Sequence, residues 1–88
     1  MSYQLKLHKS VTKFLKSAPA KTRQRIVDKL NLLQENPLTH PQLDIKVMQG
    51  LTDTYRLRIG LLRIIYQIQQ DKLTIYLLTI GSRGDVYK

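Results

Sequence analysis

The chain has 88 residues without a cysteine, and its 15 lysine and arginine residues against 6 acidic residues give a formal net charge of +9. A chain this short folds around one modest core, so we expect a single domain over residues 1–88. The lack of cysteine excludes a disulfide framework and thiolate catalysis. The excess of positive charge favours polyanionic partners, with nucleic acid as the leading class.

The sequence gives little support for a metal site or a membrane span. Neither His8 nor His40 has a second histidine or a carboxylate at ligand spacing, so we expect no metal and no cofactor. No apolar stretch approaches the roughly 18 residues of a membrane helix, and residues 1–8 are too polar for a secretory signal. We therefore expect a soluble, cytoplasmic protein.

The first 36 residues predict one strand and two helices. Apolar and polar residues alternate over residues 3–8, as in a strand with one buried face. From Ser10 the apolar spacing becomes helical, and Pro19 suits the first turn of a second helix. Asn36 precedes a proline, so the second helix ends near Glu35 and the two helices form a hairpin. The apolar stripe of the second helix comprises Ile26, Val27, Leu30 and Leu33.

The second half of the chain is dominated by predicted strands. Residues 36–50 read as an irregular connection, with a brief strand around residues 45–48. Gly60 and Leu61 suit a two-residue hairpin turn that has glycine at its first central position. The resulting register pairs apolar residues on the face that the helices cover: Ile59 with Leu62, Leu57 with Ile64, and Tyr55 with Tyr66.

A second two-residue turn, at Gln70 and Asp71, would place Ile68 opposite Leu73 and keep the apolar residues on the same face. These elements predict an α+β fold in a small single domain. It comprises an N-terminal strand, a helical hairpin, and then a mainly antiparallel sheet of three to four strands.

The opposite face of the Gly60 hairpin carries arginines. Arg58 would face Arg63, with Arg56 beside them, and opposed like charges cost about 0.2 to 1 kcal/mol. Asp53 and Asp71 belong to loops, so we expect a ligand to supply the missing counter-charge. Guanidinium groups bind phosphate oxygens through paired hydrogen bonds, which makes phosphate the expected ligand. The alternative interpretation is that these arginines simply face the solvent from a strand and bind no ligand.

The C-terminal residues 81–88 place Arg83 and Tyr87 directly after an apolar run, where a small domain would normally fray. We interpret Arg83 as a fourth arginine of the anion site. RNA cleavage needs a base for the 2′-OH, stabilised charge at phosphorus and a proton for the 5′ oxygen. Arginine is too basic to be that base. Neighbouring cations lower the pKa of a tyrosine from its usual value of about 10, so Tyr87 is the best candidate.

Other charged and aromatic residues have simpler interpretations. The lysines of the two helices, together with Arg23 and Arg25, are expected to face outward, where they aid solubility and attract phosphate backbones diffusely. Tyr55, Tyr66 and Tyr76 lie inside strand patterns and are expected to pack. The two histidines are expected to be ordinary surface or loop residues.

Three segments together resemble the RelE/ParE superfamily of prokaryotic toxins, on its RelE side: YRLRIG (residues 55–60), LRIIY (62–66) and IGSRGDVY (80–87). The order of strand, two helices and several strands also matches that fold. The resemblance implies the toxin of a type II toxin–antitoxin system, a metal-independent endoribonuclease that enters the ribosomal A site, cleaves mRNA there and so inhibits translation. It also implies a RelB-like antitoxin bound in a hetero-oligomer.

The same resemblance implies roles for individual residues. Arg56 and Arg58 take two basic strand positions and Arg63 the arginine of the next strand, and all three bind phosphate and stabilise its developing charge. Arg83 lies near the leaving group, and Tyr87 activates the 2′-OH.

The chain departs from the pattern of its relatives at several positions. Some relatives carry lysines where this chain has Arg56 and Arg58, and others have a histidine where it has Ser82 or an Asp-Tyr pair at residues 61–62. These differences bear on the proton path and not on phosphate binding. Two alternatives stay open: a ParE-like gyrase inhibitor without nuclease activity, and an inactive module that binds RNA or antitoxin.

Overall fold

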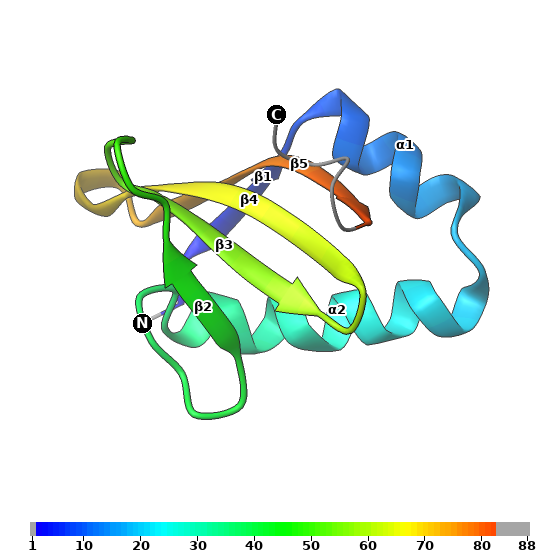
Figure 1. The fold of residues 1–88 in the computed structure, drawn as a ribbon. Coiled ribbons are helices and arrows are strands. Elements are labelled where there is room, and N and C mark those ends of the chain that lie inside the picture. Colours follow the sequence, from blue (N-terminus) through cyan, green and yellow to red (C-terminus); the bar gives the residue numbers. More distant parts are fainter. Residues whose placement is uncertain (1, 83–88) are drawn as a thin grey trace.

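The computed structural model of the protein describes residues 2–82. Figure 1 shows two helices packed against a twisted sheet. In chain order the elements are β1 (Gln4–Leu7), α1 (Lys9–Ser17), α2 (Ala20–Glu35), β2 (Asp44–Val47), β3 (Thr54–Ile59), β4 (Leu62–Gln69), the 3₁₀ helix η1 (Gln70–Lys72) and β5 (Thr74–Ser82).

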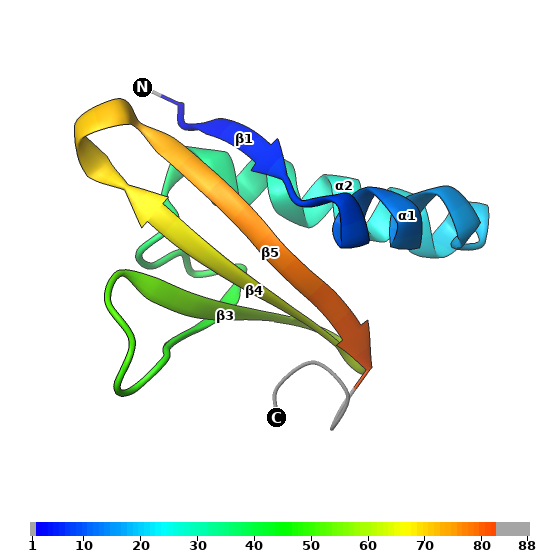
Figure 2. The same ribbon diagram turned by 90° about the horizontal axis from the view of Figure 1, so that it is seen from above.

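The five strands form one sheet in the order β1-β5-β4-β3-β2. β1 runs parallel to β5, and the other neighbours are antiparallel. The helical hairpin carries the chain from β1 at one edge of the sheet to β2 at the opposite edge, and Figure 2 shows both helices on one side of the sheet. The predicted α+β class is confirmed: four strands follow the hairpin, and the N-terminal strand makes the fifth.

The helices begin and end close to the predicted positions. α1 starts at Lys9, because the Nδ1 atom of His8 accepts a hydrogen bond from the backbone N–H of Ser10 at 3.1 Å and caps the helix. α2 follows Pro19 and ends at Glu35, where Asn36 adopts an extended conformation. Val27 does not belong to the buried stripe, since it is 39% exposed.

The core lies between the helices and the face of the sheet that they cover. Tyr66 is fully buried in it and stacks on Tyr55, with ring centroids 5.7 Å apart. Its hydroxyl donates a 2.7 Å hydrogen bond to the carbonyl of Pro37. Burial raises the pKa of Tyr66 far above its usual value of 10.0, and the neighbouring Tyr55 raises it further. The predicted packing role of these two tyrosines is therefore confirmed.

The register of the β3–β4 hairpin is confirmed. Ile59 pairs with Leu62 and Arg58 with Arg63. Gly60 has a φ of +59° at the first central position of the turn, a conformation in which glycine carries no steric penalty. The paired apolar residues therefore face the helices, and the arginines face the opposite side, together with Ile65, which pairs with Arg56.

The predicted register of the next hairpin is wrong by two residues as far as Tyr66, and a β-bulge between Ile65 and Tyr66 makes it wrong by three beyond that point. Ile68 pairs with Ile75 and not with Leu73. Gln70 and Asp71 lack the glycine that a two-residue turn favours, so the chain passes through η1 and Leu73 takes a left-handed conformation. A shift of two residues keeps the same side chains in the core.

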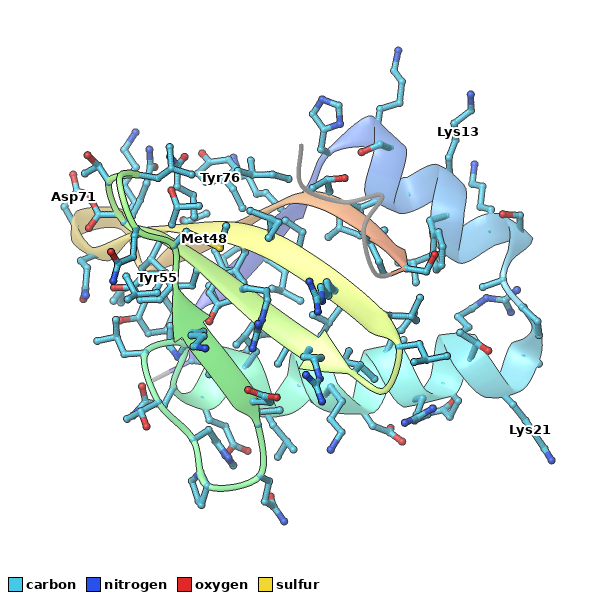
Figure 3. The ribbon with its side chains drawn as sticks, viewed as in Figure 1. Lys13, Lys21, Met48, Tyr55, Asp71 and Tyr76 are labelled. Atoms are coloured by element: carbon cyan, nitrogen blue, oxygen red, sulfur yellow. The ribbon has the colours of Figure 1, made fainter. Side chains whose placement is uncertain are left out.

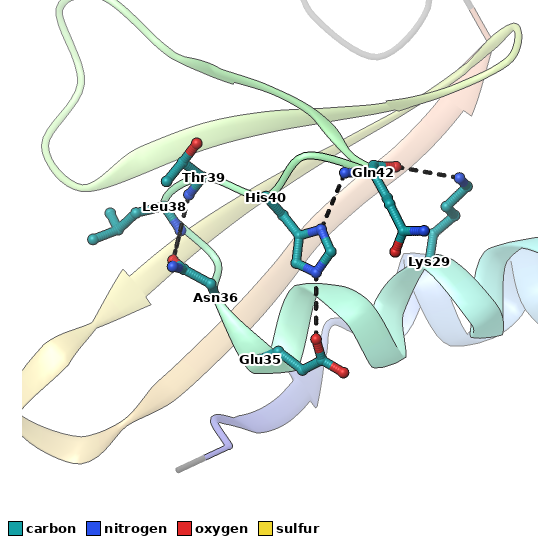
Figure 4. A network of polar contacts seen from close by, with 7 residues as sticks. All are labelled: Lys29, Glu35, Asn36, Leu38, Thr39, His40 and Gln42. Carbon is teal, nitrogen blue, oxygen red and sulfur yellow. Dashed lines mark hydrogen bonds and ion pairs between the residues drawn. The ribbon is translucent and has the colours of Figure 1, made fainter.

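A polar network fastens the loop after α2 to the helix (Figure 4). Asn36 Oδ1 accepts from the N–H groups of Leu38 and Thr39 at 3.1 and 3.4 Å. The ring of His40 contacts the Glu35 carboxylate at 3.3 Å, and its Nδ1 accepts from the N–H of Gln42 at 3.1 Å. These contacts hold the loop that connects α2 to β2.

Candidate functional site

Arginines from β3 and β4 lie on the face of the sheet that the helices leave uncovered. Arg58 and Arg63 are direct cross-strand neighbours next to the Gly60 turn. Together with Gly60 and Leu61 they line a hollow of about 240 Å³. Two guanidinium groups beside one small opening are suited to a single anion of phosphate size.

Arg56 lies one pleat further along β3 and is much less accessible. Its side chain is 17% exposed, compared with 51% for Arg58. Its Nε atom is buried without a hydrogen-bond partner among residues 2–82. The structure therefore places Arg58 and Arg63 as cross-strand neighbours at the hollow, whereas Arg56 is more enclosed.

The expectation that no local acid relieves the arginines is wrong. Asp44 Oδ1 lies 3.2 Å from Arg56 Nη2, and Asp44 Oδ2 lies 3.6 Å from Arg58 Nε. The sequence places Asp44 in an irregular connection, but β2 begins at this residue and sets it opposite Arg58. The only signal in the sequence was the alternation of residues 44–47, which is too short to fix a register.

One carboxylate does not neutralise the site. Asp44 contacts two of the three arginines, and Arg63 has no ion pair within the described part of the chain. Lys46 pairs with Arg56 across β2 and β3 and adds a further positive charge to this face. The uncovered face therefore carries a net positive charge beside the hollow.

Arg83 and Tyr87, together with Asp85, lie outside the described residues, which end at Ser82. The proposed roles of Arg83 and Tyr87 consequently stay predictions. β5 ends at Ser82, and Gly81 pairs with Arg63. The described part of the chain therefore ends on β5, which is the neighbour of the strand that carries Arg63.

Two arginines of α2 have more specific positions than the outward one that the sequence predicts. Arg23 donates from Nε and Nη2 to the carbonyls of Leu15 and Ala18, both at 2.9 Å, and so secures the end of α1. Arg25 lies against Gly60 in the β3–β4 turn. By contrast, Figure 3 shows Lys13 and Lys21 projecting away from the protein body, as expected.

The described residues contain neither a metal-ligand cluster nor a membrane helix. Residues 2–82 contain no group of three or more His, Cys, Asp or Glu side chains that could hold a metal ion. In the same part of the chain, neither helix is long and apolar enough to cross a membrane. The uncovered face of β3 and β4 carries Arg56, Arg58 and Arg63 and is called the arginine face below. It is the strongest candidate site.

Comparisons with known proteins agree with this reading of the fold. A family model for the ParE toxin of the type II toxin–antitoxin system parDE matches residues 5–87. The candidate toxin RelE1 of Methanocaldococcus jannaschii is 32% identical over 88 residues, which are 100% of this chain and 98% of that protein.

Two archaeal structures are similar over most of both chains. The RelE–RelB complex of Pyrococcus horikoshii OT3 matches with a TM-score of 0.83 and 31% identity, over 97% of this chain and 99% of that one. The RelB–RelE antitoxin–toxin complex of Methanococcus jannaschii matches with a TM-score of 0.71 and 30% identity, over 88% of each chain. The chain therefore belongs to the ParE toxin family of type II toxin–antitoxin systems, as a RelE-like member.

Proposed function

We propose that this toxin is a ribosome-dependent endoribonuclease that binds the scissile phosphate of mRNA at the arginine face. The observation that carries the proposal is the pair of opposed guanidinium groups, Arg58 and Arg63, beside a hollow of about 240 Å³. Such donors stabilise charge as it develops on a phosphate in the transition state. Action on ribosomes requires a cytoplasmic location.

The proposed reaction is an attack by the 2′ oxygen on the adjacent phosphorus. The phenolate form of Tyr87 accepts the proton of the 2′-OH, the bond from the 2′ oxygen to phosphorus forms, and the bond from phosphorus to the 5′ oxygen breaks. Arg58 and Arg63 stabilise the phosphorane, and Arg56 adds to the positive field behind them. Arg83 is proposed to stand near the leaving 5′ oxygen, which takes up a proton from water, and Tyr87 then releases its proton to the solvent. The products are a 2′,3′-cyclic phosphate and a 5′-hydroxyl end.

A RelB-like antitoxin is the proposed protein partner. The similar archaeal toxins were solved as complexes of RelE with RelB. A formal net charge of +9 favours a partner that brings acidic residues to the toxin. Co-expression with the neighbouring reading frame should yield a stable hetero-oligomer, and recovery of free, harmless toxin from that co-expression would contradict this.

The nuclease proposal is tested by incubating the purified protein with ribosomes programmed with a defined mRNA. The wild-type protein should cut the mRNA in the A site, and Arg83→Ala and Tyr87→Phe should each slow cleavage by about 10²- to 10³-fold. Lys13→Ala on the outside of α1 is the matched control for lost charge. Cleavage unchanged in both C-terminal variants would remove the proposed mechanism.

A second candidate function is inhibition of DNA gyrase. The family model that matches residues 5–87 is described as the ParE toxin of parDE, which is the observation that favours it. The same small fold can serve unrelated targets. Intact mRNA on ribosomes together with gyrase-dependent DNA cleavage would establish this function in place of the nuclease.

A further inference from the structure

Arg25 of α2 reaches the tip of the β3–β4 hairpin and occupies the space beside Gly60. A Cβ atom built on Gly60 would lie 2.9 Å from Nη2, 3.4 Å from Nη1 and 3.5 Å from Cζ of Arg25. The guanidinium group of Arg25 therefore lies close to the position that a Cβ atom would take at residue 60. The absence of a side chain at this position allows a helix arginine to reach the turn.

Gly60 also lines the hollow between Arg58 and Arg63. The same residue thus contacts Arg25 and borders the candidate phosphate site. Arg25 does not itself line the hollow, but it brings a further guanidinium group, from a different element of the fold, to the glycine at the border of the hollow. Arg25 is exposed, so its N–H groups remain accessible to a ligand.

Arg25 has no carboxylate partner within residues 2–82. The nearest acid along α2, Asp28, accepts a hydrogen bond from Gln24 at 2.9 Å. Arg23, on the same helix, already donates to two backbone carbonyls. Of the α2 arginines, only Arg25 therefore has its donors free for an outside anion.

We propose that Arg25 forms a second phosphate subsite, which binds a phosphate adjacent to the scissile one as the RNA strand passes over the Gly60 turn. The subsite rests on the proposed function, because the scissile phosphate is assigned to Arg58 and Arg63. An RNA strand repeats its phosphate at every nucleotide, so a strand held at one guanidinium pair brings the next phosphate to a guanidinium nearby. A planar guanidinium group matches that phosphate through paired hydrogen bonds.

The test measures binding of a short RNA whose nucleotide at the cleavage position carries a 2′-O-methyl group. The full-length protein is compared with Arg25→Met, which keeps the aliphatic stem, and with Lys21→Met, which removes the same charge from the same helix. Arg25→Met should weaken binding by about tenfold and lower the magnitude of the salt slope by about 1. Lys21→Met should have a clearly smaller effect, since Figure 3 shows Lys21 pointing away from the body. Arg25→Lys, which keeps the charge but not the planar fork, should fall between wild type and Arg25→Met.

Replacing each flanking phosphate in turn by an uncharged methylphosphonate locates the contact. With one of the two substituted RNAs, wild type and Arg25→Met should bind equally, whereas the effect of Lys21→Met should persist. Equal losses for Arg25→Met and Lys21→Met, or a loss that survives both substitutions, would overturn the subsite. So would an Arg25→Met defect that appears with a poly-glutamate peptide but not with RNA.

The two proposals fail separately. The binding readout uses an RNA that cannot be cleaved, so an absence of cleavage on ribosomes would remove the nuclease and leave the phosphate contact of Arg25 intact. Conversely, normal cleavage with no binding defect in Arg25→Met would remove the subsite alone. Unfolding midpoints of the variants should match wild type and so exclude misfolding as the cause.

Discussion

Asp44 and Arg58 are direct neighbours across β2 and β3, and their charged groups lie 3.6 Å apart. The same carboxylate also contacts Arg56 at 3.2 Å. Under the proposed function, Asp44 would compete with a bound phosphate for these two arginines. It holds two guanidinium groups in place while no ligand is bound, and it offsets part of their charge.

Replacing Asp44 by Asn should strengthen RNA binding. Loss of a carboxylate about 4 Å from the site removes on the order of 1 kcal/mol of repulsion toward phosphate, or about fivefold in affinity. Because Asp44 is 55% exposed, the free energy of unfolding should fall by less than about 1 kcal/mol. RNA titration and urea denaturation measure the two effects. Asp71→Asn in η1 is the control for net charge, and an equal gain in that variant would show that the contact of Asp44 is irrelevant.

The three arginines of β3 and β4, Arg56, Arg58 and Arg63, should differ in their contribution to cleavage. Arg63→Ala should slow single-turnover cleavage most, by about 10²- to 10³-fold, because Arg63 borders the hollow without an ion pair in residues 2–82. Arg58→Ala should cost less, since Arg58 shares its charge with Asp44. Arg56→Ala should act mainly through stability, given its enclosed side chain. Cleavage rates and unfolding free energies measured together decide the order, and a dominant catalytic effect of Arg56 would contradict it.

Gly60→Ala should destabilise the protein by about 1 to 2 kcal/mol, because a φ of +59° is unfavourable for a residue with a side chain. The new Cβ would lie 2.9 Å from Nη2 of Arg25, which is the far end of a flexible side chain and can move aside at little further cost. Gly50→Ala is a matched control, because Gly50 has a φ of +82° and no neighbouring atom within 4 Å of its Cβ position. Urea denaturation should give defects of similar size for the two variants, and Arg25→Ala should change the Gly60→Ala defect little in a double-mutant cycle. A much larger defect at Gly60 that Arg25→Ala relieves would contradict this expectation.

Tyr66→Phe should lower the free energy of unfolding by about 1 to 3 kcal/mol, because the buried carbonyl of Pro37 loses its donor. Tyr66→Phe should also change how the free energy of unfolding depends on pH in the alkaline range. Burial raises the pKa of Tyr66 in the folded state, so stability from this group is complete below the usual pKa of 10.0 and falls as the pH rises above it. Urea denaturation from pH 8 to pH 11 should show a smaller loss in Tyr66→Phe than in wild type. A parallel loss in both proteins would indicate other groups.

Strong local signals explain why much of the fold follows from the sequence. Helical periodicity, the Asn36 break and the glycine at position 60 fix α1, α2 and the β3–β4 register, and that register brings Arg58 opposite Arg63. The β4–β5 register could not be derived, because the connection through η1 has no turn signature. A two-residue error left the core unchanged, so the hydrophobic pattern gave no warning of it.

The parts of the site that the sequence misses depend on contacts between distant elements. Asp44 reaches the arginines only because β2 pairs with β3, and the four residues of β2 carry too little pattern to predict that pairing. Arg25 reaches Gly60 only because α2 crosses beneath the hairpin tip. Both residues look like ordinary surface charges when the chain is read alone.

The central claim, that the arginine face supports attack of the 2′ oxygen on a bound phosphate, is tested most directly by removing that oxygen. A ribosome-bound mRNA with a single 2′-deoxynucleotide before the scissile phosphate should bind the toxin as well as the all-ribose mRNA but resist cleavage. The all-ribose mRNA should give a 2′,3′-cyclic phosphate end. Cleavage of the deoxy-substituted mRNA at the same position and rate would contradict the account.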